Sequence, residues 1–240
     1  MLSNGKYSRT SHYLFSPGTT SDDRQNHQWF EDICKLNTVV HTEKLDGENN
    51  CLNGVGVFAR SHGAITTHPW SNYLKVKHNL MKKDLIDLDL EIFGENLYAK
   101  HSIEYTNIDQ HFYVFAVRQD GMWLSWEEVC MWAGLFDFPT VPLLGYSYPK
   151  QMFEENGLTP EQFTKHVLSI VKEPSTFNSI DTYTGKNCTM EGIVTRNALG
   201  FSVDLFKENV FKYVRSNHVK TDKHWIRNWK RAPLNWEKKI

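Results

Sequence analysis

The chain has 240 residues, of which 40% are hydrophobic and 23% charged, a composition that predicts a globular protein with a real core. A net charge of −1 disfavours a general polyanion binder, and the apolar runs are too short to span a membrane. The four cysteines lie far apart with no Cys-x-x-Cys pair, which favours reduced thiols over structural zinc. We therefore expect a cytoplasmic protein without a membrane partner.

The segment through Asp23 is rich in Ser, Thr, Gly and Tyr and predicts irregular chain laid over the domain. Strand-like runs follow at residues 38–44, 54–60, 88–93, 112–117, 192–195 and 210–214. Helical patterns alternate with them at residues 71–85, from 125 to about 135, and from 159 onward. Short strand–turn–strand spacing around residue 44 favours antiparallel pairing. The predicted fold class is α+β, with antiparallel sheets flanked by helices, not a doubly wound parallel fold.

Two features refine the predicted helices. In the stretch 71–85, the apolar positions at helical spacing, which should face the core, are Leu74, Val76 or Lys77, Leu80 and Met81. The two later helices each open on a capping box, at residues 125–128 and 159–162, and the second has proline at its first position.

The most informative motif is Lys44-Leu45-Asp46-Gly47, at the end of a β-branched run. A lysine ammonium becomes a nucleophile only when its proton is removed or its pKa is depressed. A strand lysine beside carboxylates and a metal–nucleotide complex could be used in that way. The Lys-x-Asp-Gly pattern is the nucleotidyl-acceptor signature of ATP-dependent ligases and mRNA capping enzymes.

Five downstream positions are further candidates, although each alone also fits an ordinary structural role. Arg60 ends the next strand and could bind phosphate, and Glu95, after Gly94, could accept from a ribose hydroxyl. The positions that complete the set are Phe115 for stacking on a base, Glu191 for a divalent cation or the lysine proton, and Lys212 for phosphate.

The C-terminal part is basic. From residue 207 onward ten Lys and Arg residues face only three acidic ones, with three tryptophans interleaved. Basic residues with aromatics suit a nucleic-acid backbone and its exposed bases. The alternative is a solvated helix whose tryptophans pack on the core.

Taken in order, these motifs resemble the series of the covalent nucleotidyltransferase superfamily. The chain resembles its RNA ligase branch typified by the second RNA ligase of phage T4, and most of all a set of compact bacterial and phage RNA ligases. The segments that carry this resemblance are Thr10-Ser11-His12, Ser16-Pro17-Gly18, Gly94–Ile103 and Lys212–Val219.

The resemblance implies an ATP-dependent RNA ligase that uses Mg²⁺ or Mn²⁺ and acts on RNA ends; whether a protein partner is needed stays open. Lys44 would form a lysyl-AMP, which then passes to a 5′-phosphate and is displaced by a 3′-hydroxyl. The other implied roles are adenine contact for Glu43, phosphate or 3′-end binding for Arg60, ribose binding for Glu95, base stacking for Phe115, metal and nucleophile contact for Glu191, and α-phosphate neutralisation for Lys212.

Two departures from the branch stand out. Its last motif is usually Lys-x-Lys, whereas here the position two residues after Lys212 is Val214. Either Arg215 supplies the second positive charge, or Lys212 aligns to the second lysine of the motif. We expect one nucleotidyltransferase (ATP-grasp-like) domain over residues 1–240, no OB domain, and a basic tail from about residue 220. The residues that we expect to contact nucleic acid are Arg60, Arg215, Lys223, Arg227 and Lys230. The alternatives are a DNA ligase, a GTP-dependent capping-type transferase, and a non-catalytic end-binding module.

Overall fold

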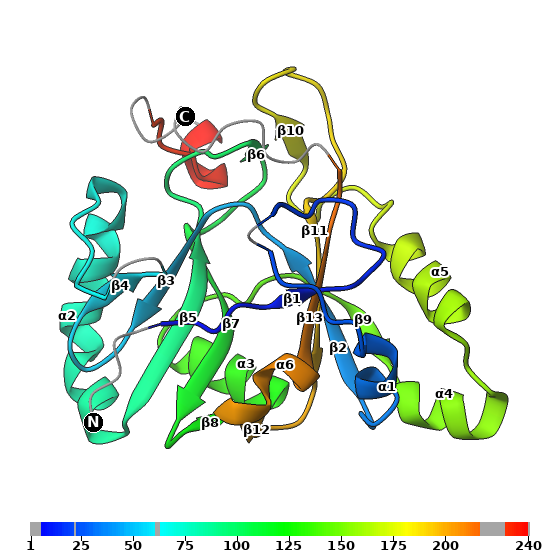
Figure 1. The fold of residues 1–240 in the computed structure, drawn as a ribbon. Helices are drawn as coiled ribbons and strands as arrows, with labels where there is room; N and C mark the ends of the chain where they lie inside the picture. Colours follow the sequence, from blue (N-terminus) through cyan, green and yellow to red (C-terminus); the bar gives the residue numbers. More distant parts are fainter. Residues whose placement is uncertain (1–5, 22, 61–62, 217–228, 240) are drawn as a thin grey trace.

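Two β-sheets with helices on their outer sides form the protein (Figure 1). The computed structural model describes residues 6–21, 23–60, 63–216 and 229–239. The five-stranded sheet has the spatial order β1 (Ser11–His12), β13 (Val210–Val214), β11 (Gly192–Asn197), β2 (Val39–Lys44), β9 (Leu143–Ser147). The six-stranded sheet has the order β12 (Phe201–Ser202), β8 (Met122–Trp123), β7 (Phe112–Gln119), β5 (Leu90–Asn96), β3 (Glu48–Leu52), β4 (Val57–Ala59). A small pair, β6 (Ile103–Tyr105) and β10 (Ser179–Asp181), lies beside them.

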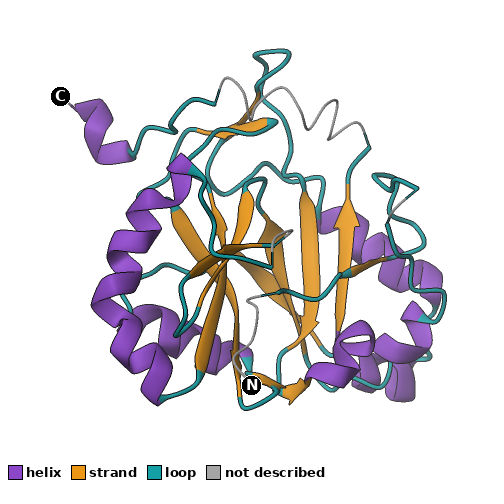
Figure 2. Cartoon of the chain, turned by 60° about the vertical axis from the view of Figure 1, so that its left-hand side comes forward, coloured by secondary structure: helices purple, strands orange, loops and turns teal. Residues whose placement is uncertain are grey.

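The helices cover the two sheets from outside, as Figures 1 and 2 show. The α-helices are α1 (Trp29–Ile33), α2 (Asn72–Asp87), α3 (Trp126–Leu135), α4 (Pro149–Asn156), α5 (Pro160–Ile170) and α6 (Phe206–Asn209). Short 3₁₀ turns are η1 (Pro69–Ser71), η2 (Val203–Leu205) and η3 (Asn235–Lys239). Helices α2 and α3 share a core with the six-stranded sheet, and α1 and α5 share one with the five-stranded sheet. Within the described ranges, every helix is too short or too polar to cross a bilayer.

The predicted α+β class is confirmed, because the strand pairs are antiparallel apart from β1 with β13. The run 54–60 proved to be two parts, a turn and the short β4. Strand β3 was missed because its sequence, Glu-Asn-Asn-Cys-Leu, begins with three polar residues. Of these residues, Glu48 and Asn49 line the pocket described below.

Both predicted capping boxes are confirmed. The hydroxyl of Ser125 accepts from the backbone N–H of Glu128 while the Glu128 carboxylate accepts from the backbone N–H of Ser125. Thr159 and Gln162 make the same reciprocal pair at the start of α5. Each box satisfies two helix-terminal donors, so the sequence located these helix starts to within one residue.

The predicted buried face of α2 was partly wrong. Leu74 and Met81 are buried as expected, but Val76 is 65% and Leu80 is 83% exposed. The helix instead turns His78 inward, where its Nε2 lies 2.7 Å from the carbonyl oxygen of Asn53. A polar side chain with a buried partner takes a core position that apolar spacing alone assigned to its neighbours.

A row of buried, hydrogen-bonded polar side chains connects β2 with β11, β9 and α5. His41 is fully buried, with Nδ1 2.9 Å from the Thr195 hydroxyl and Nε2 2.9 Å from the Ser147 hydroxyl. The Ser147 hydroxyl in turn lies 2.9 Å from Nε2 of His166. Burial, helped by the nearby His166, lowers the pKa of His41 to about 3.

This burial makes stability depend on pH. In the unfolded chain a histidine takes up a proton near pH 6.5, whereas folded His41 stays neutral until about pH 3, so acidification favours unfolding. Between pH 7 and pH 5 the wild type should lose about 2 kcal/mol more unfolding free energy than His41→Gln. Urea unfolding at both pH values measures this difference. His27→Gln, at an exposed site, should keep the wild-type dependence, and equal losses in wild type and His41→Gln would contradict the assignment.

Candidate active site

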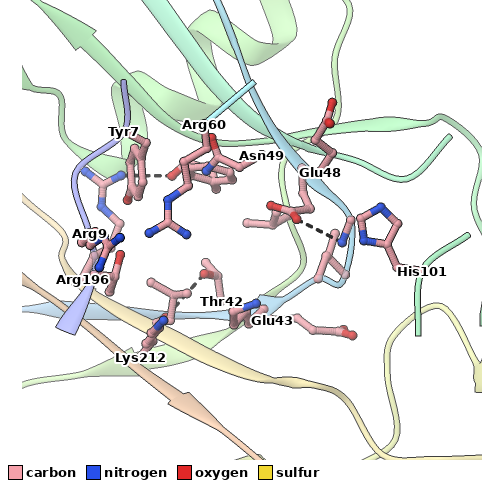
Figure 3. Close-up of a pocket in the computed structure, with 18 of the residues that line it drawn as sticks. Tyr7, Arg9, Thr42, Glu43, Glu48, Asn49, Arg60, His101, Arg196 and Lys212 are labelled. Carbon is pink, nitrogen blue, oxygen red and sulfur yellow. Dashed lines mark hydrogen bonds between the residues drawn. The ribbon is translucent and has the colours of Figure 1, made fainter. Parts of the chain in front are cut away.

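A pocket of about 760 Å³ lies between the two sheets (Figure 3). Strands β2, β11 and β13 supply its lining from one sheet, and β3, β4, β5 and β7 from the other. The N-terminal segment closes a further side with Lys6, Tyr7, Arg9, Thr10, Asp23 and Arg24. Among the lining side chains, Lys and Arg outnumber Asp and Glu by seven to four. A cavity with this balance suits a polyanionic ligand.

The Lys44 motif joins the two sheets at the pocket. Strand β2 ends at Lys44 and β3 begins at Glu48, so the turn between them carries the chain from one sheet to the other. Asp46 fixes this turn, because its carboxylate accepts from the backbone N–H of Ile103 at 2.8 Å. A side chain at Gly47 would lie 2.6 Å from the Asn96 carbonyl oxygen, so only glycine fits. The Asp-Gly pair is thus needed to seat the turn against the residues after β5.

Lys44 and Glu191 form the centre of the site. Strand pairing sets Lys44 opposite Gly192, which brings the Glu191 carboxylate to 2.5 Å from Lys44 Nζ. The Glu191 side chain is only 4% exposed. Burial alone would lower the pKa of Lys44, but Glu191, Glu95 and Asp46 outweigh it and raise the pKa. In the ligand-free protein Lys44 is therefore a protonated amine held on its carboxylate partner.

Two more acidic side chains, Glu95 and Glu43, lie near this pair. Glu95 accepts from the backbone N–H of Gly47 at 3.0 Å, and burial raises its pKa to about 8, with Lys44 opposing and Glu191 reinforcing the shift. Glu43 accepts from the Ser175 hydroxyl at 2.5 Å, and burial raises its pKa as well. Both line the pocket.

Phe115 and Arg60 lie on the six-stranded side. The Phe115 ring comes from β7 and packs edge-on against Tyr7, with ring centres 5.0 Å apart. Arg60 directly follows β4, and its guanidinium extends into the pocket (Figure 3). Both residues therefore have access to a ligand in this cavity.

Lys212 lies in the pocket, whereas Arg215 is not among the lining residues. Strand β13 runs between β1 and β11, so Lys212 is not on an edge strand pointing to water, and its side chain is 14% exposed. Burial and the charge of Lys44 lower the pKa of Lys212, and Asp23, at 3.2 Å, opposes them. The backbone of Arg215 donates to the carbonyl oxygen of Glu191 at 2.9 Å. Of these two cationic residues, Lys212 lines the pocket and Arg215 does not.

The basic tail has a packing role in its described part. Residues 229–239 return to the loop after β5, where the backbones of Lys100 and Lys230 are hydrogen-bonded at 2.9 Å. Trp229 packs on Tyr98, and Arg231 pairs with Glu237. The exposed Lys230 lies outside the pocket lining. The predicted nucleic-acid contacts at Lys223 and Arg227 lie outside the described residues.

Sequence reasoning missed several lining residues, notably Tyr7, Arg9, Asp23 and Arg196. Arg196 is 4% exposed, and its guanidinium donates to the carbonyl oxygens of Phe115 and Leu124. Alternation along β11 could have found it, since it shares a face with Val194. The residues before position 24 show no regular alternation of polar and apolar residues, so nothing in the sequence indicated which of them would line a pocket.

Comparisons with known proteins find a matching family model and similar solved structures. The family model described as RNA ligase matches residues 37–214, which is most of the chain. The structure resembles the Naegleria gruberi RNA ligase solved with PPi, with 17% identity, a TM-score of 0.52, and 90% of this chain and 63% of that chain covered. It also resembles a lysine-to-alanine variant of that ligase solved with ATP and Mn, with 16% identity, a TM-score of 0.51, and 88% and 60% covered.

These similarities have a defined extent. At identities this low the solved structures establish a shared fold, and the chain spans less than two thirds of the length of the Naegleria gruberi ligase. No curated protein sequence matches the chain. The more specific resemblance to the phage T4 branch stays a prediction. With the family model covering both the Lys44 motif and the β13 lysine, the chain belongs to the RNA ligase family.

Proposed function

We propose that the chain is an ATP-dependent RNA ligase that works through a covalent lysyl-AMP. The observation that carries this proposal is the Lys44 amine, hydrogen-bonded to Glu191 and surrounded by Glu95, Arg60 and Lys212 in one pocket between the sheets. A nucleophile, a proton acceptor and phosphate-binding cations are the groups that nucleotidyl transfer requires.

In the first step, the Lys44 lone pair attacks the α-phosphorus of ATP. The new N–P bond forms as the bond to the bridging oxygen breaks, and pyrophosphate leaves. Glu191 is the group closest to the Lys44 proton and accepts it. Lys212 and Arg60 neutralise charge on the phosphates, and Phe115, Glu95 and Glu43 hold the adenosine.

Lys44 reacts only as a neutral amine, yet its carboxylate neighbours raise its pKa in the ligand-free protein. The phosphates of ATP alone would raise the pKa of Lys44 further, whereas a divalent cation bound with ATP would lower it. A divalent cation fits here: Mg²⁺ usually binds through one or two carboxylates plus substrate phosphates, and Glu191 is a buried carboxylate beside the pocket. When bound, Mg²⁺ or Mn²⁺ would supply charge neutralisation at the phosphates, and Glu191 would hold it.

In the later steps, the adenylate passes from Lys44 to the 5′-phosphate of an RNA strand, and a 3′-hydroxyl then displaces AMP to seal the strand. Membership of the RNA ligase family supports RNA ends as the substrate. Arg215, Lys230 and the tail residues Lys223 and Arg227 are the proposed contacts to the RNA backbone. Free cysteines suit a cytoplasmic setting, which is part of the proposal.

The proposal is tested by offering the purified protein labelled ATP or GTP with Mg²⁺ or Mn²⁺, and then nicked or single-stranded RNA or DNA with 5′-phosphate ends. We expect an acid-labile protein adduct from ATP and sealing of RNA. Label from GTP, or sealing of DNA only, would favour the capping-type or DNA ligase alternatives. A protein that takes no label from either nucleotide would favour a non-catalytic module.

A further inference from the structure

The described N-terminal residues 7–21 and 23–26, which we call the strap, lie before the region matched by the family model. Its strand β1 pairs in parallel with β13 and sets His12 opposite Lys212. Further along the strap, Gln25 lies beside His12 and runs parallel to it: the backbone N–H of His12 donates to the carbonyl oxygen of Arg24 at 2.7 Å, and that of Asn26 donates to the carbonyl oxygen of His12 at 3.0 Å. This arrangement places the Asp23 carboxylate beside both His12 and Lys212.

Side chains of the strap form a connected path from the backbone of β13 to its lysine. The backbone N–H of Val214 donates to the Ser16 hydroxyl at 2.9 Å, and that hydroxyl lies 2.8 Å from Nδ1 of His12. On its other edge, Nε2 of His12 lies 3.2 Å from Oδ1 of Asp23. The same oxygen lies 3.2 Å from Nζ of Lys212.

The Ser16 hydroxyl accepts from the backbone N–H of Val214, and its own proton faces two acceptors, the Val214 carbonyl oxygen at 3.3 Å and Nδ1 of His12 at 2.8 Å. When the hydroxyl donates over the shorter distance, to Nδ1, the ring proton is on Nε2, which faces Asp23. His12 is 1% exposed, and burial together with Lys212 lowers its pKa to about 4, so it is a neutral ring. A neutral imidazole orients Asp23 without competing with Lys212 for its charge.

The strap packs closely against the end of β13. The backbone N–H of Gly18 donates to the carbonyl oxygen of Val214 at 2.9 Å. A side chain at Gly18 would come within 2.4 Å of the carbonyl oxygen of Arg215. This close approach fixes the strap at the end of β13, two residues from Lys212.

We propose that His12 and Asp23 are positioning residues, which hold Lys212 Nζ in place for the α-phosphate. The inference rests on the proposed function, in which Lys212 touches that phosphate. It gives the strap, which the family model does not cover, a share in catalysis. The charged and titratable groups that face Lys212 are Asp23 and His12 from the strap, Lys44 from β2 and Arg60 after β4.

The ion pair between Asp23 and Lys212 should change the pKa of Lys212. Burial and Lys44 lower the pKa of Lys212, whereas Asp23 raises it. Removing the Asp23 charge should therefore let Lys212 lose its proton at lower pH, by about one pH unit for an opposite charge at this range. Asp23→Glu restores the charge and should restore most of the titration.

The test has two readouts. Competitive acetylation of the folded protein across pH 7–11, quantified by mass spectrometry, reports the titration of Lys212 without any need for activity. Single-turnover labelling by ATP across the same range reports the maximal rate and its fall at high pH. Asp87→Asn is the matched control, because Asp87 pairs with Lys83 on the exposed side of α2.

We expect Asp23→Asn to move the titration of Lys212 and the high-pH fall of the rate downward by about one unit, and to lower the maximal rate about tenfold or more. Asp23→Glu and Asp87→Asn should stay near wild type in both titrations. An unchanged Lys212 titration in Asp23→Asn, or equal losses in the Asn and Glu variants, would overturn the inference. If the wild type takes no label, the proposed function fails while the acetylation readout still decides the pairing.

Discussion

Lys44→Ala is expected to abolish labelling by ATP, with a loss of more than about 1,000-fold, because it removes the amine that is hydrogen-bonded to the proton acceptor Glu191. The fold should persist, since the Lys44 side chain is 26% exposed and lies at the end of β2. Its removal also leaves the buried Glu191 carboxylate without that cation, so a loss of about 1–3 kcal/mol of unfolding free energy is expected. The measurement is label retained on the denatured protein after incubation with ATP.

Two controls sharpen this prediction. Lys77→Ala removes a lysine that pairs with Asp137 far from the pocket and should label as the wild type does. Circular dichroism and a thermal melt report whether Lys44→Ala is folded. A folded Lys44→Ala protein that labels like the wild type would refute the assignment of the nucleophile.

Glu191→Gln is expected to lower the rate of labelling by about 10² to 10⁴-fold, the usual contribution of a positioned proton acceptor. The amide keeps the shape of the side chain but accepts a proton poorly and neutralises no cation. Lys44 remains present, so slow labelling should persist, in contrast to Lys44→Ala. Single-turnover kinetics with saturating ATP distinguish the two variants.

The matched control for Glu191→Gln is Glu91→Gln. Glu91 is also a buried strand carboxylate, and it pairs with Arg118 outside the pocket. Breaking that pair should cost stability without slowing the chemistry. Equal losses of rate in both variants would mean that Glu191 acts only through the fold.

Regular patterning explains what the sequence could predict. Strand β13 was located to the residue, because Val-Phe-Lys-Tyr-Val is rich in β-branched and aromatic residues. The starts of α3 and α5 followed from their capping boxes. The motif order brought Lys44, Glu95 and Lys212 together, and the three do line one pocket.

What the sequence left out depends on long-range contacts. Nothing local at Asp23 indicates that it meets Lys212, since 189 positions separate the two residues. Strand β3 was not predicted because it opens with a polar run, in which Asn49 lines the pocket and the amide of Asn50 donates to the Glu48 carboxylate. In the same way, Val76 and Leu80 fit the helical period, yet tertiary packing turned His78 inward instead.

The central claim is that the Lys44 amine carries the nucleotide. After incubation with ATP and Mg²⁺, the protein would be digested at neutral pH and its peptides mapped by mass spectrometry. We predict AMP on the peptide that contains Lys44, lost after acid treatment. AMP on a different lysine, or full ligation with an unmodified Lys44 throughout the reaction, would contradict the account.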